Sequence, residues 1–259
     1  MLVNAVTATE VIEVPWNLVM WLCERFSWTG TAMAAVVLGV GVLLCIVVPY
    51  LLGSINPAIL FSKLIYRDDI RNHGSGNAGT TNMLRTFGLK AAGLTLLCDF
   101  LKAIVAVWIG RLIFAGFGGS IAGFFVVFGH MFPIFYRFKG GKGVACAGMV
   151  ALAINPIIFL FLLFIFLVVA IGTRLVSLAS VMCALFYPLL FNAFAKNVDM
   201  AVPMAFMITV FVIFMHRENL KRIWNHEEKR LDLSKFSLKK KKKKAEGKPA
   251  ENEEKSEQK

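Results

Sequence analysis

The 259-residue sequence has few charged residues, 17% in total, and it lacks the apolar/polar alternation of a transmembrane β-barrel. Its five cysteines are scattered, and no two have the spacing of a metal or redox site. We therefore interpret them as small core residues. No basic segment precedes the amphipathic stretch 10–28, which argues against a signal peptide there.

Several catalytic motifs are also missing. The sequence has neither the GxxxxGK[ST] spacing of a Walker A loop nor a GxSxG nucleophile elbow. The pair Asn72-His73 is followed by Ala78 where the NHxxxxD pattern of one acyltransferase class requires aspartate. No cluster of Asp and His suggests zinc or magnesium. We therefore predict no cofactor and no metal.

What the sequence does contain is long apolar segments. Hydrophobic residues make up 58% of the chain, 23 of them phenylalanine, and the mean hydropathy is +0.69. A membrane-spanning helix needs about 20 such residues, and an open sheet cannot satisfy its backbone in lipid. We predict an all-α, polytopic membrane helical bundle of about seven transmembrane helices. The predicted spans are 33–53, 90–114, 121–136, 144–154, 156–172, 177–194 and 201–216.

Proline and the basic residues refine this prediction. Asn155-Pro156 divides one long apolar segment, because proline lacks the backbone donor that a helix needs. Basic residues collect on alternate connections, which predicts an outside N-terminus and a cytoplasmic C-terminus. The predicted inside set comprises Lys63, Arg67, Arg71, Arg85, Lys90, Arg137, Lys139, Lys142 and Arg174, and the outside set Arg25, Arg111 and Lys196.

Composition divides the chain into three parts. Residues 1–30 form an N-terminal extension, either an interfacial helix or a packed segment. Residues 31–226 form the membrane domain. Residues 227–259 are expected to be a disordered basic cytoplasmic tail containing Lys239 to Lys244. This tail is either solvated or attracted to anionic lipid, at about 1 kcal/mol per basic residue. No folded basic face indicates nucleic acid as a partner.

Two polar loops fall on the predicted inside face. Residues 71–82 (RNHGSGNAGTTN), the asparagine loop, combine glycine with amide and hydroxyl side chains and can form an anion-binding nest. A helix that begins at Thr80 or Thr81 would add a favourable dipole. Residues 139–143 (KGGKG), the glycine loop, combine close backbone approach with two positive charges, which suits phosphate. A flexible connector and a positive-inside turn are the respective alternatives.

Three further pairs lie at helical spacing. Ser177 and Ser180 share a helix face, as do His216 and Asn219. Each pair either caps or packs its helix or contacts a ligand. Asp99 and Lys102 lie inside a predicted span, where charges are costly, and we interpret them as a neutralising pair that also faces the site.

Five segments carry a resemblance to a known family: GSINPAILFSKL, DIRNHGSGNAGTTNMLRTFG, GHMFPIFYRFKGGKGVA, VSLAS and HRENLKRI. In these segments the chain resembles the bacterial acyl-phosphate:glycerol-3-phosphate acyltransferases, over about residues 35–226. The resemblance implies seven spans, a cytoplasmic active site in the bacterial inner membrane, no metal and no use of acyl-CoA. It departs at GSINP, at Ala145-Cys146 and at Lys102-Ala103.

The implied reaction acylates the 1-hydroxyl of glycerol 3-phosphate from acyl phosphate, and gives lysophosphatidic acid and phosphate in the first committed step of phospholipid synthesis. An acyl-phosphate-forming enzyme is the expected functional partner. His216 is either a general base or a phosphate ligand. The predicted catalytic residues are Ser54, Arg71, His216 and Asn219, and the predicted substrate-binding residues are Ser75, Asn77, Thr80, Asn82, Lys102, Lys139, Gly140, Gly141, Lys142, Gly143, Ser177 and Ser180.

Two other classes of function compete with this one. A transporter of an organophosphate would share the spans and the phosphate loops, but the sequence shows no inverted repeat and its polar groups gather on one face. A non-catalytic lipid anchor would explain the polylysine tail but not the two loops.

Overall fold

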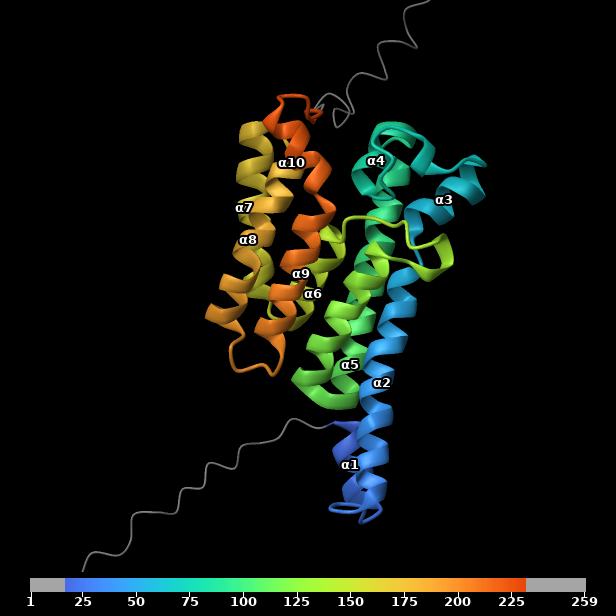
Figure 1. The fold of residues 1–259 in the computed structure, drawn as a ribbon, viewed down its shortest axis with the longest axis vertical. Coiled ribbons are helices and arrows are strands. Elements are labelled where there is room, and N and C mark those ends of the chain that lie inside the picture. Colours follow the sequence, from blue (N-terminus) through green and yellow to red (C-terminus); the bar gives the residue numbers. More distant parts are fainter. Residues whose placement is uncertain (1–16, 232–259) are drawn as a thin grey trace, which may run out of the picture.

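The computed structural model describes residues 17–231, and within this range every regular element is a helix (Figure 1). The elements are α1 Leu18–Arg25, α2 Ala32–Ser54, α3 Pro57–Tyr66, η1 Ile70–Asn72, α4 Thr80–Phe87, α5 Leu89–Met131, η2 Ile134–Tyr136, α6 Val144–Ile154, α7 Pro156–Thr173, α8 Val176–Phe194, α9 Ala201–Met215 and α10 Arg217–Trp224. The all-helical prediction is therefore confirmed for the described residues.

The 43-residue helix α5 consists of two antiparallel halves. Its helical dihedral angles are interrupted at Phe114 and Ala115. Gly110 and Gly118 approach so closely that a Cβ on either would overlap the other's carbonyl oxygen. In a straight helix these residues would lie about 12 Å apart along the axis, so the chain must reverse between them. The predicted break after residue 114 is confirmed.

The second half of α5 differs from the predicted span 121–136. It is helical from Gly116 and ends at Met131, so both predicted ends were wrong. The early start depends on glycine, because Gly118 and Gly119 allow the two halves to approach at the reversal. At the other end, Pro133 lacks a backbone donor and starts the short turn η2.

The helix α2 packs along the second half of α5 through glycines. A Cβ on Gly53 would overlap the carbonyl oxygen of Val126, and one on Gly129 would overlap that of Tyr50. Only glycine allows this approach of the two backbones. The end of α2 and the end of α5 are therefore fixed against each other.

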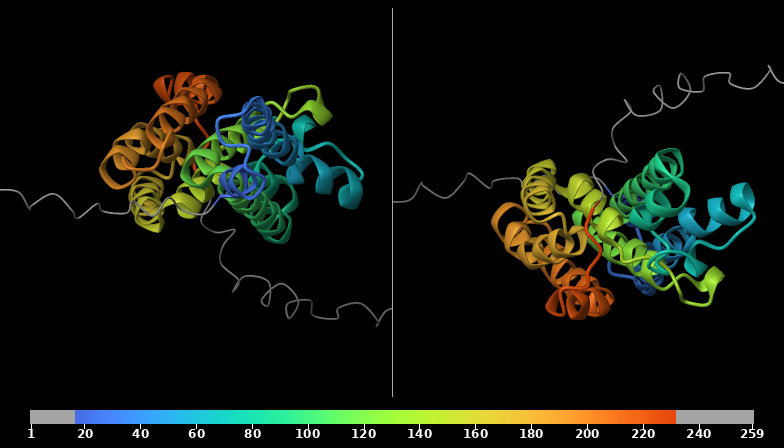
Figure 2. Two further views of the ribbon diagram at one scale, coloured as in Figure 1. Left: turned by 90° about the horizontal axis from the view of Figure 1, so that it is seen from below. Right: turned by 90° about the horizontal axis from the view of Figure 1, so that it is seen from above.

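The break at Asn155-Pro156 is also confirmed. Asn155 is extended, ends α6, and caps α7 by accepting a hydrogen bond from the Ile157 amide at 2.9 Å. A Cβ on Gly148 would lie 3.9 Å from the Phe159 ring, so the chain turns at Asn155 and α7 packs back against α6. With α8 and α9 they form the second half of the bundle, and the second half of α5 lies between them and α2 (Figure 2).

The core joins these two halves through small and apolar side chains. Val107 and Val126 from α5 pack with Val150 from α6 and with Tyr187 and Phe191 from α8. The Tyr187 hydroxyl donates to the Ala147 carbonyl oxygen at 2.9 Å, which ties α8 to α6 inside the core. Outward-facing residues such as Phe164 and Leu189 are more than 60% exposed, as expected for a surface that meets lipid.

By length and composition, four helices among the described residues could cross a membrane, or five if α9 and α10 are taken together across their 54° bend. One of these four is α5, which reverses within its length. The predicted number of spans and the predicted orientation of the termini stay predictions.

The two ends of the bundle differ. Helices α3, α4 and α10 and the segment 132–143 gather at one end, here called the loop end (top of Figure 1). The helix α1 lies at the opposite end, where Val19 and Cys23 pack with Ile113 and Ile121. The described part of the N-terminal extension thus packs against the α5 reversal. The polylysine run lies outside the described residues.

Candidate active site

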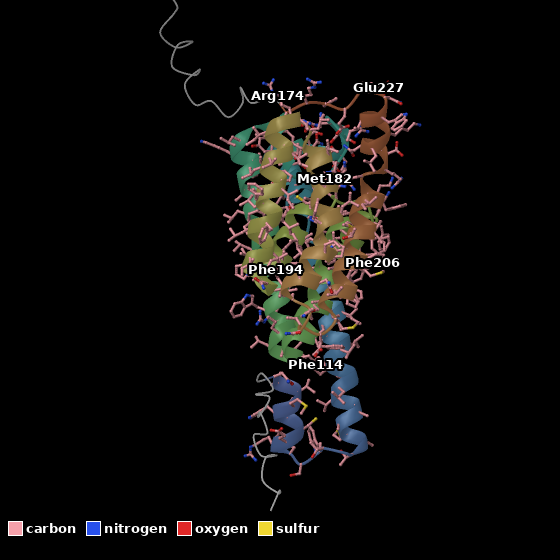
Figure 3. The ribbon with its side chains drawn as sticks, turned by 90° about the vertical axis from the view of Figure 1, so that its left-hand side faces the viewer. Phe114, Arg174, Met182, Phe194, Phe206 and Glu227 are labelled. Carbon is pink, nitrogen blue, oxygen red and sulfur yellow. The ribbon has the colours of Figure 1, made fainter. Side chains whose placement is uncertain are left out.

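The polar side chains predicted to act together converge on the loop end. Arg174 and Glu227 are at this end of the molecule, whereas Phe114 lies toward the other (Figure 3). Both polar loops, the start of α8 and the start of α10 lie toward this end. This convergence is what the distribution of basic residues predicted.

Asn82 organises the asparagine loop. Its side-chain nitrogen donates to the carbonyl oxygens of Ile70, His73 and Asn77 at 2.9–3.1 Å, and its side-chain oxygen accepts from the Ser75 amide at 3.1 Å. Asn82 is 1% exposed, so its amide serves the loop's own backbone. The loop is therefore folded around an internal residue, and the alternative of a flexible connector is not supported.

The same loop ends in a helix that begins at Thr80, one of the two predicted starts. The Thr80 hydroxyl oxygen is buried and has no hydrogen-bond partner among the described residues. The predicted substrate-binding residues Ser75 and Asn77 contact Asn82 with their main chain: the Ser75 amide donates to its side-chain oxygen, and the Asn77 carbonyl oxygen accepts from its side-chain nitrogen.

Arg71 is held in place by a carboxylate. Its Nε and Nη2 donate to the two oxygens of Asp69 at 3.0 and 2.7 Å, and its Nη1 donates to the carbonyl oxygens of Tyr136 and Lys139 at 3.2 and 3.4 Å. The hydrogen bonds from Arg71 lower the pKa of Asp69 to about 2. Arg71 thus joins the asparagine loop to the glycine loop with its guanidinium oriented from both sides.

The glycine loop rests on the end of α5. The Gly140 amide donates to the Met131 carbonyl oxygen at 3.2 Å, and the Gly141 amide donates to that of His130 at 3.1 Å. A Cβ on Gly141 would overlap the His130 ring. Gly143 has φ +79°, which only glycine adopts readily, and it leads directly into α6.

These bonds change the predicted role of the loop. The amides of Gly140 and Gly141 already have acceptors, so an anion would instead meet the first turn of α6. Amides in a first turn have no acceptor within the helix, and α6 has no side-chain cap. The helix dipole also favours negative charge there.

Lys142 connects the loop to α10. Its ammonium donates to the side-chain oxygen of Asn219. The Asn219 side-chain nitrogen donates to the Ser177 hydroxyl and to the Glu228 carboxylate, both at 2.7 Å. The structure therefore brings together three predicted site residues, Lys142, Asn219 and Ser177, from three separate parts of the chain.

Lys142 also has an altered pKa. Burial lowers the pKa of Lys142 to about 8; the attraction of Glu228 opposes this shift, and the positive charges of Arg222 and Arg85 reinforce it. A lysine with this pKa gains strongly from a phosphate dianion placed beside it, because the anion stabilises the charged ammonium.

Glu228 was not anticipated. It accepts from the Ser177 hydroxyl at 2.5 Å and from Arg222 Nε at 2.7 Å, and its side chain is 5% exposed. Burial alone would raise the pKa of Glu228, but hydrogen bonds from Ser177, Asn219 and Arg222 lower it overall. The predicted boundary of the basic tail, at 226/227, therefore falls inside this network.

Four other predicted residues have different surroundings. Ser54 is fully buried and its hydroxyl accepts from the Ile134 amide at 3.4 Å. Ser180 donates to the Val176 carbonyl oxygen at 2.9 Å, within its own helix. His216 is 2% exposed, with Nδ1 2.7 Å from the Val212 carbonyl oxygen. Lys139 contributes its carbonyl oxygen to Arg71.

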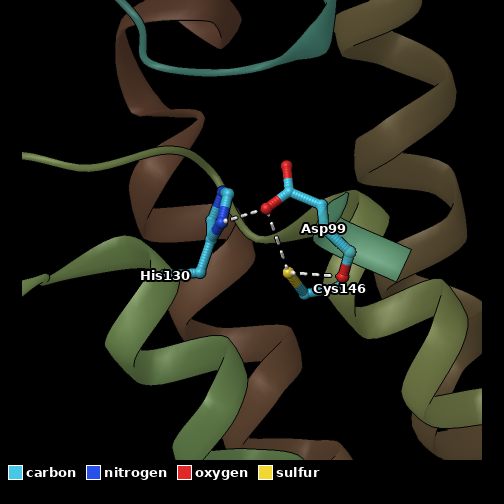
Figure 4. A group of neighbouring side chains, drawn as sticks. All are labelled: Asp99, His130 and Cys146. Atoms are coloured by element: carbon cyan, nitrogen blue, oxygen red, sulfur yellow. Dashed lines mark hydrogen bonds and ion pairs between the residues drawn. The ribbon is translucent and has the colours of Figure 1, made fainter. Parts of the chain in front are cut away.

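Asp99 and Lys102 form the predicted pair, at 2.8 Å, and His130 joins them. His130 Nδ1 lies 3.2 Å from the Asp99 carboxylate and 3.0 Å from the Lys102 ammonium. The Cys146 thiol lies 3.9 Å from the same carboxylate oxygen (Figure 4). His130 lies in the segment GHMFPIFYRFKGGKGVA quoted above. It is 28 residues from Lys102 in sequence, and no periodicity predicts a contact between the two side chains.

Asp99, His130 and Cys146 each offer one atom that could ligate a metal, all within 4.8 Å of one another. The Lys102 ammonium, however, lies beside two of these three atoms. A divalent ion would have to displace this positive charge, so the donor set does not fit a resident metal.

Fold and site together define the class: an integral membrane helical protein with a cluster of buried polar and charged side chains at one end of the bundle. A model of the family described as glycerol-3-phosphate acyltransferase matches residues 43–226. The chain belongs to this family of acyltransferases, as its motifs indicated.

Individual relatives agree. Glycerol-3-phosphate acyltransferases from Thermoanaerobacter sp. (strain X514) and Bacillus subtilis (strain 168) are 40% and 39% identical over 185 residues, which cover 71% of this chain and 93% and 95% of theirs. The crystal structure of PlsY (YgiH), an integral membrane glycerol 3-phosphate acyltransferase, superposes in its glycerol 3-phosphate form with a TM-score of 0.71 at 36% identity, covering 75% of this chain and 98% of that one. The lysophosphatidic acid form of the same protein superposes with a TM-score of 0.69 at 34% identity, covering 76% of this chain and 99% of that one.

Proposed function

We propose that this protein transfers a fatty acyl group from acyl phosphate to the 1-hydroxyl of glycerol 3-phosphate, and releases lysophosphatidic acid and phosphate. Family membership supports the acyl acceptor and the product, since solved relatives include a glycerol 3-phosphate form and a lysophosphatidic acid form. The choice of acyl phosphate as donor rests on the resemblance of the loop motifs to the acyl-phosphate-dependent acyltransferases, and the loop end offers two separate features that suit anions.

The first of these features surrounds Lys142. Its buried ammonium donates to Asn219 and has further protons for the phosphate of glycerol 3-phosphate, while Asn219 and Ser177, which donate to Glu228, hold the lysine in place. Arg71 provides a second, pre-oriented positive charge across the glycine loop. This cluster is the observation that carries the proposal, because a buried lysine with such partners gains most from a bound dianion.

The second feature is the uncapped start of α6, which follows the glycine loop. It suits the phosphate of the acyl donor, whose chain would extend along the apolar bundle. Binding both anions on either side of one loop would place the acceptor hydroxyl near the acyl carbon, and such proximity contributes up to about 7–11 kcal/mol.

The chemistry needs little further help. An acyl phosphate is a mixed anhydride, so the hydroxyl oxygen forms the new ester bond as the bond from the acyl carbon to the phosphate oxygen breaks. The proton passes either to His216 or to an oxygen of the departing phosphate. We favour the phosphate oxygen, because it is part of the reacting acyl phosphate, whereas His216 is only 2% exposed.

In the cell, the loop end is proposed to face the cytoplasm across a bacterial inner membrane, in agreement with the distribution of basic residues. Glycerol 3-phosphate would then enter from the cytoplasm. The acyl phosphate would come from an enzyme that forms it, and the product would leave into the lipid.

The test uses purified full-length protein in detergent, palmitoyl phosphate as donor and phosphate release as the signal. Release that requires glycerol 3-phosphate, with palmitoyl-CoA inert as donor, would support the proposal. Activity with palmitoyl-CoA alone would overturn the donor assignment. No release from folded protein would favour transport of an organophosphate, tested next by liposome uptake of glycerol 3-phosphate.

A further inference from the structure

We propose that Lys102, together with Asp99 and His130, is a positioning group that holds the Ser54 turn and the glycine loop at a fixed spacing. The inference rests on the proposed function, because it assigns these residues a role in that reaction. It replaces the prediction that Lys102 binds substrate.

The hydrogen bonds of Lys102 are the first reason. Its ammonium lies 3.1 Å and 2.9 Å from the carbonyl oxygens of Gly53 and Ile55, 2.8 Å from Asp99 and 3.0 Å from His130 Nδ1. An ammonium has three protons, and the two carbonyl oxygens with the Asp99 carboxylate already provide three acceptors, to which His130 Nδ1 adds a fourth in one of its tautomers. Its side chain is 9% exposed. Lys102 therefore has no proton left for a substrate.

The carbonyl groups that Lys102 binds flank a single site residue. Gly53 and Ile55 lie on either side of Ser54, where α2 ends. The carbonyl groups at the end of a helix have no partner within it, and a lysine ammonium is a suitable one. Through these two bonds Lys102 fixes the backbone that carries Ser54.

His130 connects this pair of charges to the glycine loop. Its carbonyl oxygen accepts from the Gly141 amide at 3.1 Å, and its ring lies against the same glycine. The next residue is Lys142, whose ammonium binds Asn219. A displacement of His130 would therefore move the loop and the lysine that we assign to glycerol 3-phosphate.

Asp99 holds both Lys102, which binds the Ser54 turn, and His130, which binds the glycine loop. It is 1% exposed and contacts Lys102 and His130 with the same carboxylate oxygen. A buried carboxylate needs a positive charge beside it, and here the chain's own lysine takes the place that a metal ion has in other Asp/His/Cys sites. Removing the ammonium would leave the carboxylate without this neutralising charge. The Ser54 turn and the glycine loop would then no longer be held at a fixed spacing.

The decisive experiment is amide hydrogen exchange on the substrate-free, full-length protein. Lys102→Met removes the charge, and Lys90→Met, an exposed lysine on the same helix, is the matched control. We expect exchange at Gly140 and Gly141 and at the end of α2 to be at least about tenfold faster in Lys102→Met only, the equivalent of about 1.4 kcal/mol. Unchanged exchange would overturn the proposal.

Kinetics provide a second readout. A positioning role predicts that kcat falls in Lys102→Met by about 10²-fold, as for a small misplacement of reacting groups. A residue that only bound glycerol 3-phosphate would raise its KM and leave kcat and the substrate-free exchange unchanged. In Lys102→Ala, added methylammonium should restore part of kcat, whereas the corresponding Lys90→Ala variant should not respond.

Should Lys102→Met fail to fold, Lys102→Arg keeps the charge beside Asp99 but changes the donor geometry. Faster exchange limited to the same two segments would support the proposal, and unchanged exchange would overturn it. Because exchange needs no substrate, the result holds even if wild-type protein releases no phosphate from palmitoyl phosphate, which would be a failure of the proposed function alone.

Discussion

The side-chain amide of Asn219 donates to the buried carboxylate of Glu228 at 2.7 Å, while its oxygen accepts from the Lys142 ammonium. One asparagine thus connects a positive and a negative charge from the glycine loop and from the segment that follows α10. The electrostatic behaviour of Lys142 therefore depends on residues that lie far from it in sequence.

The pH dependence should reveal this lysine directly. Lys142 is charged below its pKa of about 8 and neutral above it, so kcat/KM for glycerol 3-phosphate should fall as pH rises through 8. Kcat should depend less on pH, because a bound phosphate dianion stabilises the charged form. We call this decrease of kcat/KM the alkaline limb. The substrate does not cause it, since the phosphate of glycerol 3-phosphate is fully ionised well above about pH 6.

Lys142→Arg is the control for that profile. Arginine stays charged throughout this range, so the variant should lose the alkaline limb even if its activity is lower. An alkaline limb that persists near pH 8 in Lys142→Arg would assign the titration to another group.

Neighbouring charges should move the limb in opposite directions. Glu228 raises the pKa of Lys142 and Arg222 lowers it. Glu228→Gln should therefore shift the limb to lower pH, and Arg222→Gln to higher pH. Ser177→Ala removes a hydrogen bond to Glu228 without removing a charge, so its limb should stay in place. Shifts in the same direction for both charge variants would contradict this electrostatic account.

Arg71 should tolerate no substitution by lysine. Its guanidinium binds both oxygens of Asp69 and reaches two carbonyl groups, a geometry that one ammonium cannot reproduce. We expect kcat/KM of Arg71→Lys to fall about 10- to 150-fold, equivalent to the roughly 1.5–3 kcal/mol of a charge-assisted hydrogen bond. Lys63→Met removes a half-exposed second cation near Asp69 and should stay within about twofold.

His216→Gln distinguishes the two routes for the proton. The Val212 carbonyl can only accept, so Nδ1 carries the hydrogen, and a neutral ring would offer Nε2 as a base. General-base catalysis contributes about 10²–10⁴-fold. If the departing phosphate takes the proton, kcat should remain above about a tenth of wild type while KM rises. A loss of kcat beyond about 10²-fold would make His216 the base.

Much of the fold could be predicted because apolar length and proline act locally. The predicted ends of α6 and α8 agree with the structure to within one residue, and Asn155-Pro156 divides α6 from α7 as expected. The start at Gly116 was missed, since a glycine-rich stretch gives no local helical signal, and its helix is stabilised by the opposite half of α5.

The site was only partly predictable for a related reason. Basic residues indicated that Lys142, Asn219 and Ser177 share one end, and the contacts among them agree. Glu228 lies 51 residues from Ser177 in sequence, and no periodicity connects them. The sequence also could not show whether the Asn82 amide faces a ligand or its own loop, because both uses require the same polar side chain.

The central claim is that the Lys142 cluster binds the phosphate of glycerol 3-phosphate. Its most direct test is calorimetric titration of glycerol 3-phosphate into purified wild-type protein and into Lys142→Met at pH 7. We predict that wild type binds and that the variant binds about 10- to 150-fold more weakly. Equal affinity in a folded Lys142→Met variant would contradict the account.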